Sequence, residues 1–154
     1  MFDEKIYRRF NHTVAACFVI YFLFPSKIAG FERIYLVILL WAIILLIEYI
    51  RLQKNVHLFG MREYEKDRVA GFVWFASGTF IILGFYEMGA FPQSFAIATI
   101  IMAAYTDPVI GEANRRLGDN WGLGLGLMCS FAIYLVITGA IFYSILGSAI
   151  AVLS

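Results

Sequence analysis

The fold is decided by residues 31–50, which read FERIYLVILLWAIILLIEYI. Charged residues occur only near the two ends of this stretch, and everything between them is apolar or aromatic. A helix of about 20 residues, rising 1.5 Å per residue, crosses the roughly 30 Å of hydrocarbon in a bilayer. A helix also satisfies its own backbone hydrogen bonds where no water is present. This stretch therefore predicts a transmembrane helix.

The composition of the whole chain fits several such helices. Hydrophobic residues make up 62% of the 154 residues, charged residues make up 15%, and the mean hydropathy is +0.80. A soluble domain of this size has no core that could bury so much apolar surface. The net charge of +1 includes no basic stripe or acidic tail, so a nucleic-acid polymer is not expected as a partner. Cys17 and Cys129 lie in apolar runs, where packed thiols are expected.

The apolar runs predict an all-α fold, a polytopic transmembrane helical bundle forming a single membrane domain over residues 1–154. Polar segments at residues 51–68 and 107–120 are predicted to be loops on the inner side of the membrane. The last apolar run is too long for one crossing, and a break near Thr138 and Gly139 would divide it. Five or six spans are therefore expected, at about residues 10–24, 31–50, 69–86, 93–106, 121–137 and, with the break, 139–154.

Basic residues lie mostly on one side of this arrangement. If the N-terminus is cytoplasmic, all twelve lysines and arginines except Lys27 and Arg33 fall in inner segments. This distribution is the one that the positive-inside rule describes. Most acidic residues fall on the same side, so the inner face carries mixed charge, which suits binding of a metal ion and an anion. We expect an integral protein of an inner or plasma membrane with its functional face in the cytoplasm.

The first charged cluster precedes the first span. Helical spacing would place Arg8 and His12 on one face, next to Arg9. These side chains could bind phosphate oxygens, or they could anchor the chain among lipid headgroups.

The second cluster lies at the inner end of the second span. Glu48 and Arg51 occur there, followed in the polar segment by Arg62 and Glu65. A carboxylate so close to the hydrocarbon is unfavourable unless it has a partner. Glu48 could pair with Arg51 three residues later, or it could have a functional role.

The third cluster is the most informative. Asp107 and Pro108 follow an apolar span, and Arg115 and Arg116 come two helical turns later. A carboxylate at the membrane surface could hold Mg²⁺, which typically bridges substrate phosphates, and guanidinium groups match phosphate geometry. Glu112 is a weaker candidate for a second metal ligand. The alternative is that Asp107 is an ordinary helix cap.

Glycines recur every fourth residue after this cluster, at Gly118, Gly122 and Gly126. They do not form a dinucleotide-binding motif, because no strand precedes them. Small residues at this spacing are typical of close helix packing in membranes. The same face could also join two copies of the chain.

In this order, the three clusters resemble a family of membrane-embedded kinases that phosphorylate polyprenols, dolichol, phytol or diacylglycerol and generally use CTP. The spacing of the aspartate, the arginine pair and the following glycine is the most specific match. The resemblance covers residues 5 to 118 and is carried by KIYRRFNH at 5–12, EYIR at 48–51, REYE at 62–65 ahead of Gly71, and Asp107, Pro108, Arg115, Arg116 and Gly118.

The resemblance implies a CTP-dependent and Mg²⁺-dependent kinase acting on an isoprenoid alcohol or diglyceride at the cytoplasmic interface. Asp107 would hold the metal, with Glu112 as a second candidate, and either Glu48 or His12 would take the hydroxyl proton. The remaining cluster residues would bind substrate and nucleotide phosphates or support that binding: Arg8, Arg9, Arg51, Arg62, Glu65, Arg115 and Arg116.

Two other functions fit parts of the same pattern. A lipid cytidylyltransferase would use CTP and a similar Mg²⁺ site, but it would release pyrophosphate instead of CDP. A non-enzymatic membrane subunit would use the clusters as anchors. It is favoured by residues 119–123, DNWGL, which lack the lysine and glutamate of the Lys-Ser/Thr-x-Glu-Gly element usual in the kinases.

Overall fold

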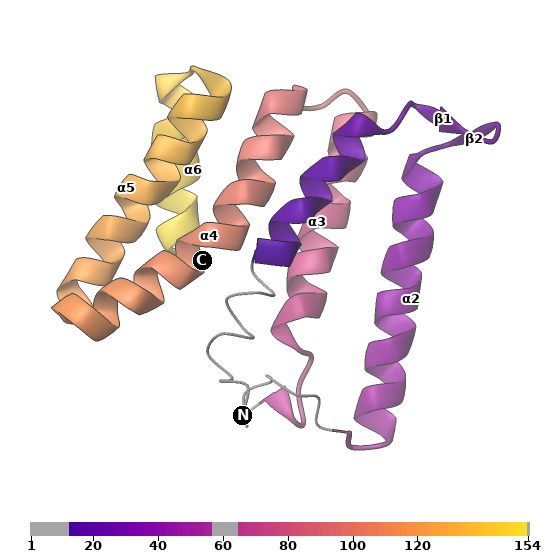
Figure 1. The fold of residues 1–154 in the computed structure, drawn as a ribbon, viewed down its shortest axis with the longest axis horizontal. Helices are drawn as coiled ribbons and strands as arrows, with labels where there is room; N and C mark the ends of the chain where they lie inside the picture. Colours follow the sequence, from indigo (N-terminus) through magenta and orange to yellow (C-terminus); the bar gives the residue numbers. More distant parts are fainter. Residues whose placement is uncertain (1–12, 57–64, 154) are drawn as a thin grey trace. The chain divides into compact units, whose positions relative to one another are not determined.

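A computed structural model describes residues 13–56 and 65–153, and this part of the chain is mainly α-helical, as predicted (Figure 1). A two-residue antiparallel hairpin, which the sequence analysis did not predict, pairs Ile28 with Phe31. The elements in chain order are η1 (Cys17–Leu23), β1 (Lys27–Ile28), β2 (Phe31–Glu32), α2 (Ile34–Gln53), α3 (Gly71–Glu87), α4 (Gln93–Leu117), α5 (Asp119–Thr138) and α6 (Ile141–Leu153).

Three of the helices are long and apolar enough to cross a membrane. They are α2, α4 and the part of α5 from Trp121 to Thr138. The segment Thr13–Leu23, α3 and α6 are also apolar, but they are shorter. Three of the five or six predicted spans therefore have the length and hydropathy that a crossing needs.

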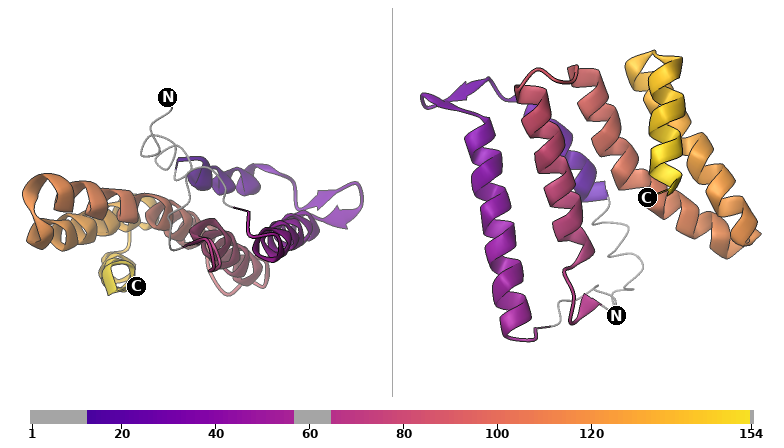
Figure 2. Two further views of the ribbon diagram at one scale, coloured as in Figure 1. Left: turned by 90° about the horizontal axis from the view of Figure 1, so that it is seen from below. Right: turned by 180° about the vertical axis from the view of Figure 1, so that it is seen from behind.

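The largest difference from the sequence analysis is at residues 107–120, which were predicted to be a loop. The structure continues α4 through Pro108 to Leu117 and begins α5 at Asp119, so the loop prediction is wrong for these residues. Proline lacks the N–H that would bond to the carbonyl four residues earlier, which bends a helix without always ending it. Figures 1 and 2 show this bend part-way along α4. The helix ends instead at Gly118, whose φ of 96° is disfavoured for other residues.

The break predicted near Thr138 and Gly139 is confirmed. Gly139 has a φ of 66° and lies between α5 and α6. Its left-handed conformation ends α5, and the hydroxyl of Thr138 accepts a hydrogen bond of 3.2 Å from the backbone N–H of Ala140. The last apolar run therefore forms two helices.

Within the compact unit formed by residues 20–90, α2 and α3 lie side by side (Figure 2). Trp41 of α2 donates a 2.9 Å hydrogen bond to Ser77 Oγ and stacks on Phe80, with 4.6 Å between the ring centroids. At the C-terminal end of α3, Glu87 accepts hydrogen bonds from Arg33 Nε at 2.8 Å and from Tyr21 Oη at 2.6 Å. Aromatic packing and polar contacts together join the two helices.

The second unit contains α4, α5 and α6, and α5 packs against both of the others. Tyr134 of α5 is almost fully buried, and its hydroxyl lies 2.8 Å from Thr99 Oγ1 on α4. Thr106 and Ser130 form a second buried hydroxyl contact of 2.8 Å between the same helices. In a bilayer, apolar side chains contact lipid tails about as favourably as they contact another helix. Polar contacts such as these therefore help to hold the helices together.

The glycine repeat packs within the chain. A Cβ added at Gly126 would collide with Ile110 of α4, and one at Gly122 would collide with Asn114. The predicted close packing is confirmed at these two positions, and Gly118 serves as the end of α4. The face offered by Gly122 and Gly126 is covered by α4, so this repeat requires no second copy of the chain.

We expect Gly126→Val to lower the free energy of unfolding by about 1–3 kcal/mol, because overpacking a close contact forces the backbones apart. Gly124→Val is the matched control, since a Cβ at Gly124 meets nothing within 4 Å. Unfolding in mixed detergent micelles, followed by circular dichroism, measures both variants. An equal loss in the two variants would contradict the packing assigned to Gly126.

Candidate functional site

The predicted site residues fall into three sets in the structure. Four of them lie outside the described residues: Arg8, Arg9, His12 and Arg62. Three belong to the unit of residues 20–90: Glu48, Arg51 and Glu65. Four lie on α4 in the other unit: Asp107, Glu112, Arg115 and Arg116.

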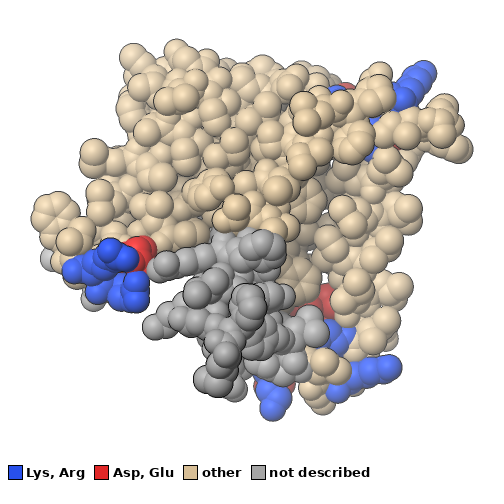
Figure 3. All heavy atoms as spheres, in the orientation of Figure 1, with Lys and Arg blue, Asp and Glu red and all other residues tan. Residues whose placement is uncertain are grey.

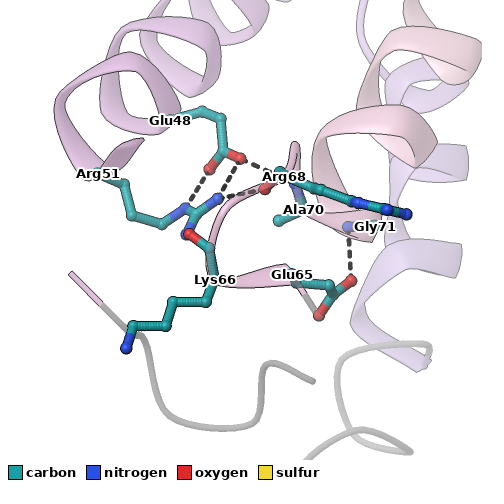
Figure 4. A network of polar contacts seen from close by, with 7 residues as sticks. All are labelled: Glu48, Arg51, Glu65, Lys66, Arg68, Ala70 and Gly71. Carbon is teal, nitrogen blue, oxygen red and sulfur yellow. Dashed lines mark hydrogen bonds and ion pairs between the residues drawn. The ribbon is translucent and has the colours of Figure 1, made fainter. Parts of the chain in front are cut away.

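Glu48 and Arg51 form a buried ion pair at the end of α2 (Figure 4). Each residue is only 3% exposed. Arg51 donates from Nε to Glu48 Oε2 and from Nη2 to Glu48 Oε1, both at 2.8 Å. This two-pronged geometry is the strongest form of an arginine–carboxylate contact, and it confirms the pairing at i and i+3 that the sequence allowed.

The Glu48–Arg51 pair also binds the backbone of residues 66–70, which follow the polar segment. Arg51 donates to the backbone carbonyls of Lys66, at 3.2 Å, and Arg68, at 2.6 Å. Glu48 Oε1 accepts a 2.8 Å hydrogen bond from the backbone N–H of Ala70. Both carboxylate oxygens of Glu48 are therefore occupied, which fits a structural role better than that of a base.

Glu65 contributes to the same end of α3. Its Oε1 accepts a 3.0 Å hydrogen bond from the backbone N–H of Gly71, the first residue of the helix. The first N–H groups of a helix lack partners within the helix, and its positive dipole end favours carboxylates. Glu48 and Glu65 thus cap α3 from outside, where its own N-cap residue Ala70 has no side chain that could do so.

Asp107 lies inside α4 with an exposed side chain, so the alternative that it caps a helix is wrong. The residue precedes Pro108 at the bend and lies two helical turns before Arg115. Among the described residues, no ion pair or hydrogen bond involves its carboxylate. It is therefore free to bind a ligand.

Glu112 joins the two arginines at the polar end of α4. Arg115 Nη2 donates to both carboxylate oxygens, at 2.7 and 2.8 Å, and Arg116 Nε donates to Oε1. Figure 3 shows a compact group of basic and acidic side chains beside a broad surface of uncharged side chains. The arginine side chains remain 52% and 69% exposed.

Glu112 follows the apolar part of α4, and its side chain is 29% exposed. Its carboxylate lies between the guanidinium groups of Arg115 and Arg116, so the cluster combines one acidic side chain with two basic ones.

The described residues contain no group of three or more histidine, cysteine or acidic side chains that could hold a metal ion by themselves. Mg²⁺ is usually held by one or two carboxylates together with water and substrate phosphates. Asp107 fits that requirement as a single protein ligand. Glu112 fits it poorly, because two arginines already engage its carboxylate.

The structure adds two features of α4 that sequence reasoning did not identify. The Oδ1 atom of Asn114 is buried and has no hydrogen-bond partner among the described residues. Gly111, one turn after Asp107, is exposed, and a Cβ there would meet nothing within 4 Å. The four-residue spacing from Asp107 could have identified Gly111 as a neighbour on the same side of the helix. The burial of Asn114 could not be foreseen in this way, because it results from the approach of Gly122 on α5.

Comparison with known proteins gives no family assignment. No protein-family model, curated protein sequence or solved structure matches the chain.

We expect Arg51→Met to lower the free energy of unfolding by about 3–5 kcal/mol, because it leaves the Glu48 carboxylate buried without its counter-ion. The control is Arg116→Met, which removes an exposed ion pair and should cost at most about 1 kcal/mol. Titration with a denaturing detergent measures both variants.

A second variant tests the cause of this loss. Adding Glu48→Leu to Arg51→Met removes the unpaired charge, so much of the lost stability should return. If Arg51→Met were no more harmful than Arg116→Met, the structural role given to the buried pair would be refuted.

Proposed function

We propose that this chain is an integral membrane kinase that transfers the γ-phosphoryl group of CTP to the hydroxyl of a polyprenol-like or dolichol-like lipid. In this proposal five or six helices cross the membrane, the N-terminus is cytoplasmic, and the reaction takes place at the cytoplasmic interface. The helices α2, α4 and α5 supply the length and hydropathy for crossing. The placement of lysines and arginines supports the orientation.

The observation that carries the proposal is the arrangement of charge on α4. Asp107 presents a free carboxylate at the bend, and the exposed guanidinium groups of Arg115 and Arg116 follow on the same helix. Phosphoryl transfer is chiefly a matter of positioning and charge neutralisation, so a carboxylate for the metal and cations for the phosphates are the essential parts. The resemblance to CTP-using lipid kinases suggests the donor and the acceptor class.

The roles of these residues follow from their chemistry. Asp107 would supply one oxygen ligand to the Mg²⁺ that accompanies the nucleotide, and that ion would neutralise charge on the phosphates. Arg115 and Arg116 would bind phosphate oxygens in place of the Glu112 carboxylate. Glu112 holds the two guanidinium groups together at the polar end of the helix when no phosphate is present.

The reaction needs a group that accepts the proton of the lipid hydroxyl. The hydroxyl oxygen forms a bond to the γ-phosphorus, the bond to the β–γ bridging oxygen breaks, and CDP leaves. Glu48 is buried, and both of its oxygens already accept hydrogen bonds. The proposal therefore gives the base role to His12, which lies outside the described residues.

A non-enzymatic membrane subunit is the second candidate. It is supported by the two charged networks that are complete within the chain, namely Glu48 with Arg51 and Glu112 with the arginines of α4. In that case the networks would serve folding and anchoring only. The free carboxylate of Asp107 would then have no assigned purpose, which is why the kinase is preferred.

The central test uses purified protein in lipid nanodiscs with Mg²⁺, CTP labelled on the γ-phosphate, and polyprenol, phytol and diglyceride acceptors. We expect the wild type to transfer label to lipid and Asp107→Asn to reduce transfer by a factor of about 10³ or more, because metal-mediated charge stabilisation is worth several kcal/mol. Asp67→Asn makes the same chemical change at another exposed position and should leave transfer intact.

The products distinguish the rival functions. Release of pyrophosphate when phosphorylated lipids are offered would indicate a cytidylyltransferase instead. Full activity in Asp107→Asn would disprove the metal role of this carboxylate. Absence of both transfer and pyrophosphate from the wild type would favour the non-enzymatic subunit.

A further inference from the structure

We propose that Gly111 is a positioning residue of this site, at which the phosphate chain of the bound nucleotide lies against the backbone of α4. The inference rests on the proposed function, because it assumes that Asp107 and Arg115 contact the same nucleotide. It assigns a specific path to the phosphates between these two residues.

The path is defined by a line of exposed positions. Asp107, Gly111 and Arg115 are spaced by four residues within α4, and all three are exposed. Residues at this spacing are neighbours on one side of a helix. A carboxylate and a guanidinium group thus flank a position that has no side chain.

Neither backbone conformation nor packing requires a glycine at residue 111, because its φ is not positive and a Cβ there would meet nothing within 4 Å. The same is true of the helical glycines Gly78, Gly84 and Gly124, but Gly111 differs from them in lying one turn from both a carboxylate and a guanidinium group. Gly122 and Gly126 differ, because α4 residues occupy the space that their side chains would need. Glycine is also a poor residue for a helix interior compared with alanine. The open space at Gly111 is therefore available to a molecule that is not part of the chain.

A phosphate chain fits that space chemically. Its cation would be held at Asp107 and its distal oxygens at Arg115, so the phosphates between them would pass directly over Gly111. Without a side chain, the helix backbone can approach a ligand closely. A methyl group at this position would hold the phosphates away by about the length of one carbon–carbon bond.

The test compares Gly111→Ala with Gly124→Ala in full-length protein in lipid nanodiscs. Gly124 is also an exposed helical glycine with open space around it, and no charged residue lies within one turn of it. We expect Gly111→Ala to raise the KM for Mg²⁺–CTP and to lower kcat/KM roughly a hundredfold, because small misplacements at a reacting group have effects of this size. Gly124→Ala should match the wild type.

Two further measurements separate this inference from the kinase proposal and from a purely structural role. Binding of a fluorescent CTP analogue with Mg²⁺ should weaken in Gly111→Ala even where no lipid acceptor is present. The midpoint of thermal unfolding should stay the same or rise in Gly111→Ala, since alanine favours a helix. A lower midpoint would mean that Gly111 serves the bend of α4, which would overturn the inference.

The remaining outcomes are equally decisive. Equal nucleotide binding and turnover in Gly111→Ala and the wild type would overturn the path over Gly111 while leaving the kinase in place. A wild type that neither binds CTP nor transfers phosphate would overturn the proposed function, and the role of Gly111 with it.

Discussion

The structure depends on one constraint: helices with outward-facing apolar side chains must satisfy their polar groups among themselves. Only 11% of the most apolar window of α2 is buried, so most of its leucine and isoleucine side chains face away from the rest of the chain. Apolar surroundings offer no hydrogen bonds, which makes an unpaired polar group costly. The contacts between helices follow from this. Trp41 bonds to Ser77, Thr99 to Tyr134 and Thr106 to Ser130.

The same constraint separates two kinds of charged group in this chain. The ion pair of Arg33 and Glu87 connects parts of the chain that are far apart in sequence. The ion pair of Arg51 and Glu48 holds the turn before α3 in place. These ion pairs are structural, because removing either partner leaves a largely buried charge without its counter-ion. The charges at the end of α4 are different. Glu112 and its arginines lie on one helix, so they could exchange partners without changing how the helices pack.

The sequence predicted those features that depend on local physics. The apolar run at 31–50 becomes α2 with a shift of three residues at each end, and the weak turn at Thr138 and Gly139 is a true helix end because glycine alone readily adopts its left-handed conformation. The loop prediction for residues 107–120 rested on their polarity and is wrong, because polar residues can also continue a helix. A proline after an apolar run usually ends a helix, but here the residues that follow pack on α5 and continue the helix.

The site was less predictable, because its bonds join positions that the sequence does not relate. Spacing of three residues suggested the pair of Glu48 and Arg51, but not that Arg51 would hold two backbone carbonyls after the polar segment. Likewise, the glycine repeat indicated close packing without naming α4 as the partner. Local periodicity identifies which residues share a helix face and whether that face is suited to close packing or ion pairing. Which element packs on that face depends on the tertiary fold.

The charge balance at the end of α4 also limits which ligands the proposed site can accept. Two arginine charges meet one carboxylate at Glu112, so the cluster carries an excess positive charge before any ligand binds. A ligand that displaces Glu112 must offer both guanidinium groups at least as many acceptor oxygens as that carboxylate does. A single carboxylate or hydroxyl gains nothing by the exchange, whereas a phosphate chain brings more oxygens and more charge. Displaced Glu112 would then repel the phosphates unless a cation at Asp107 reduced their charge, so in this proposal the metal and the arginines depend on each other.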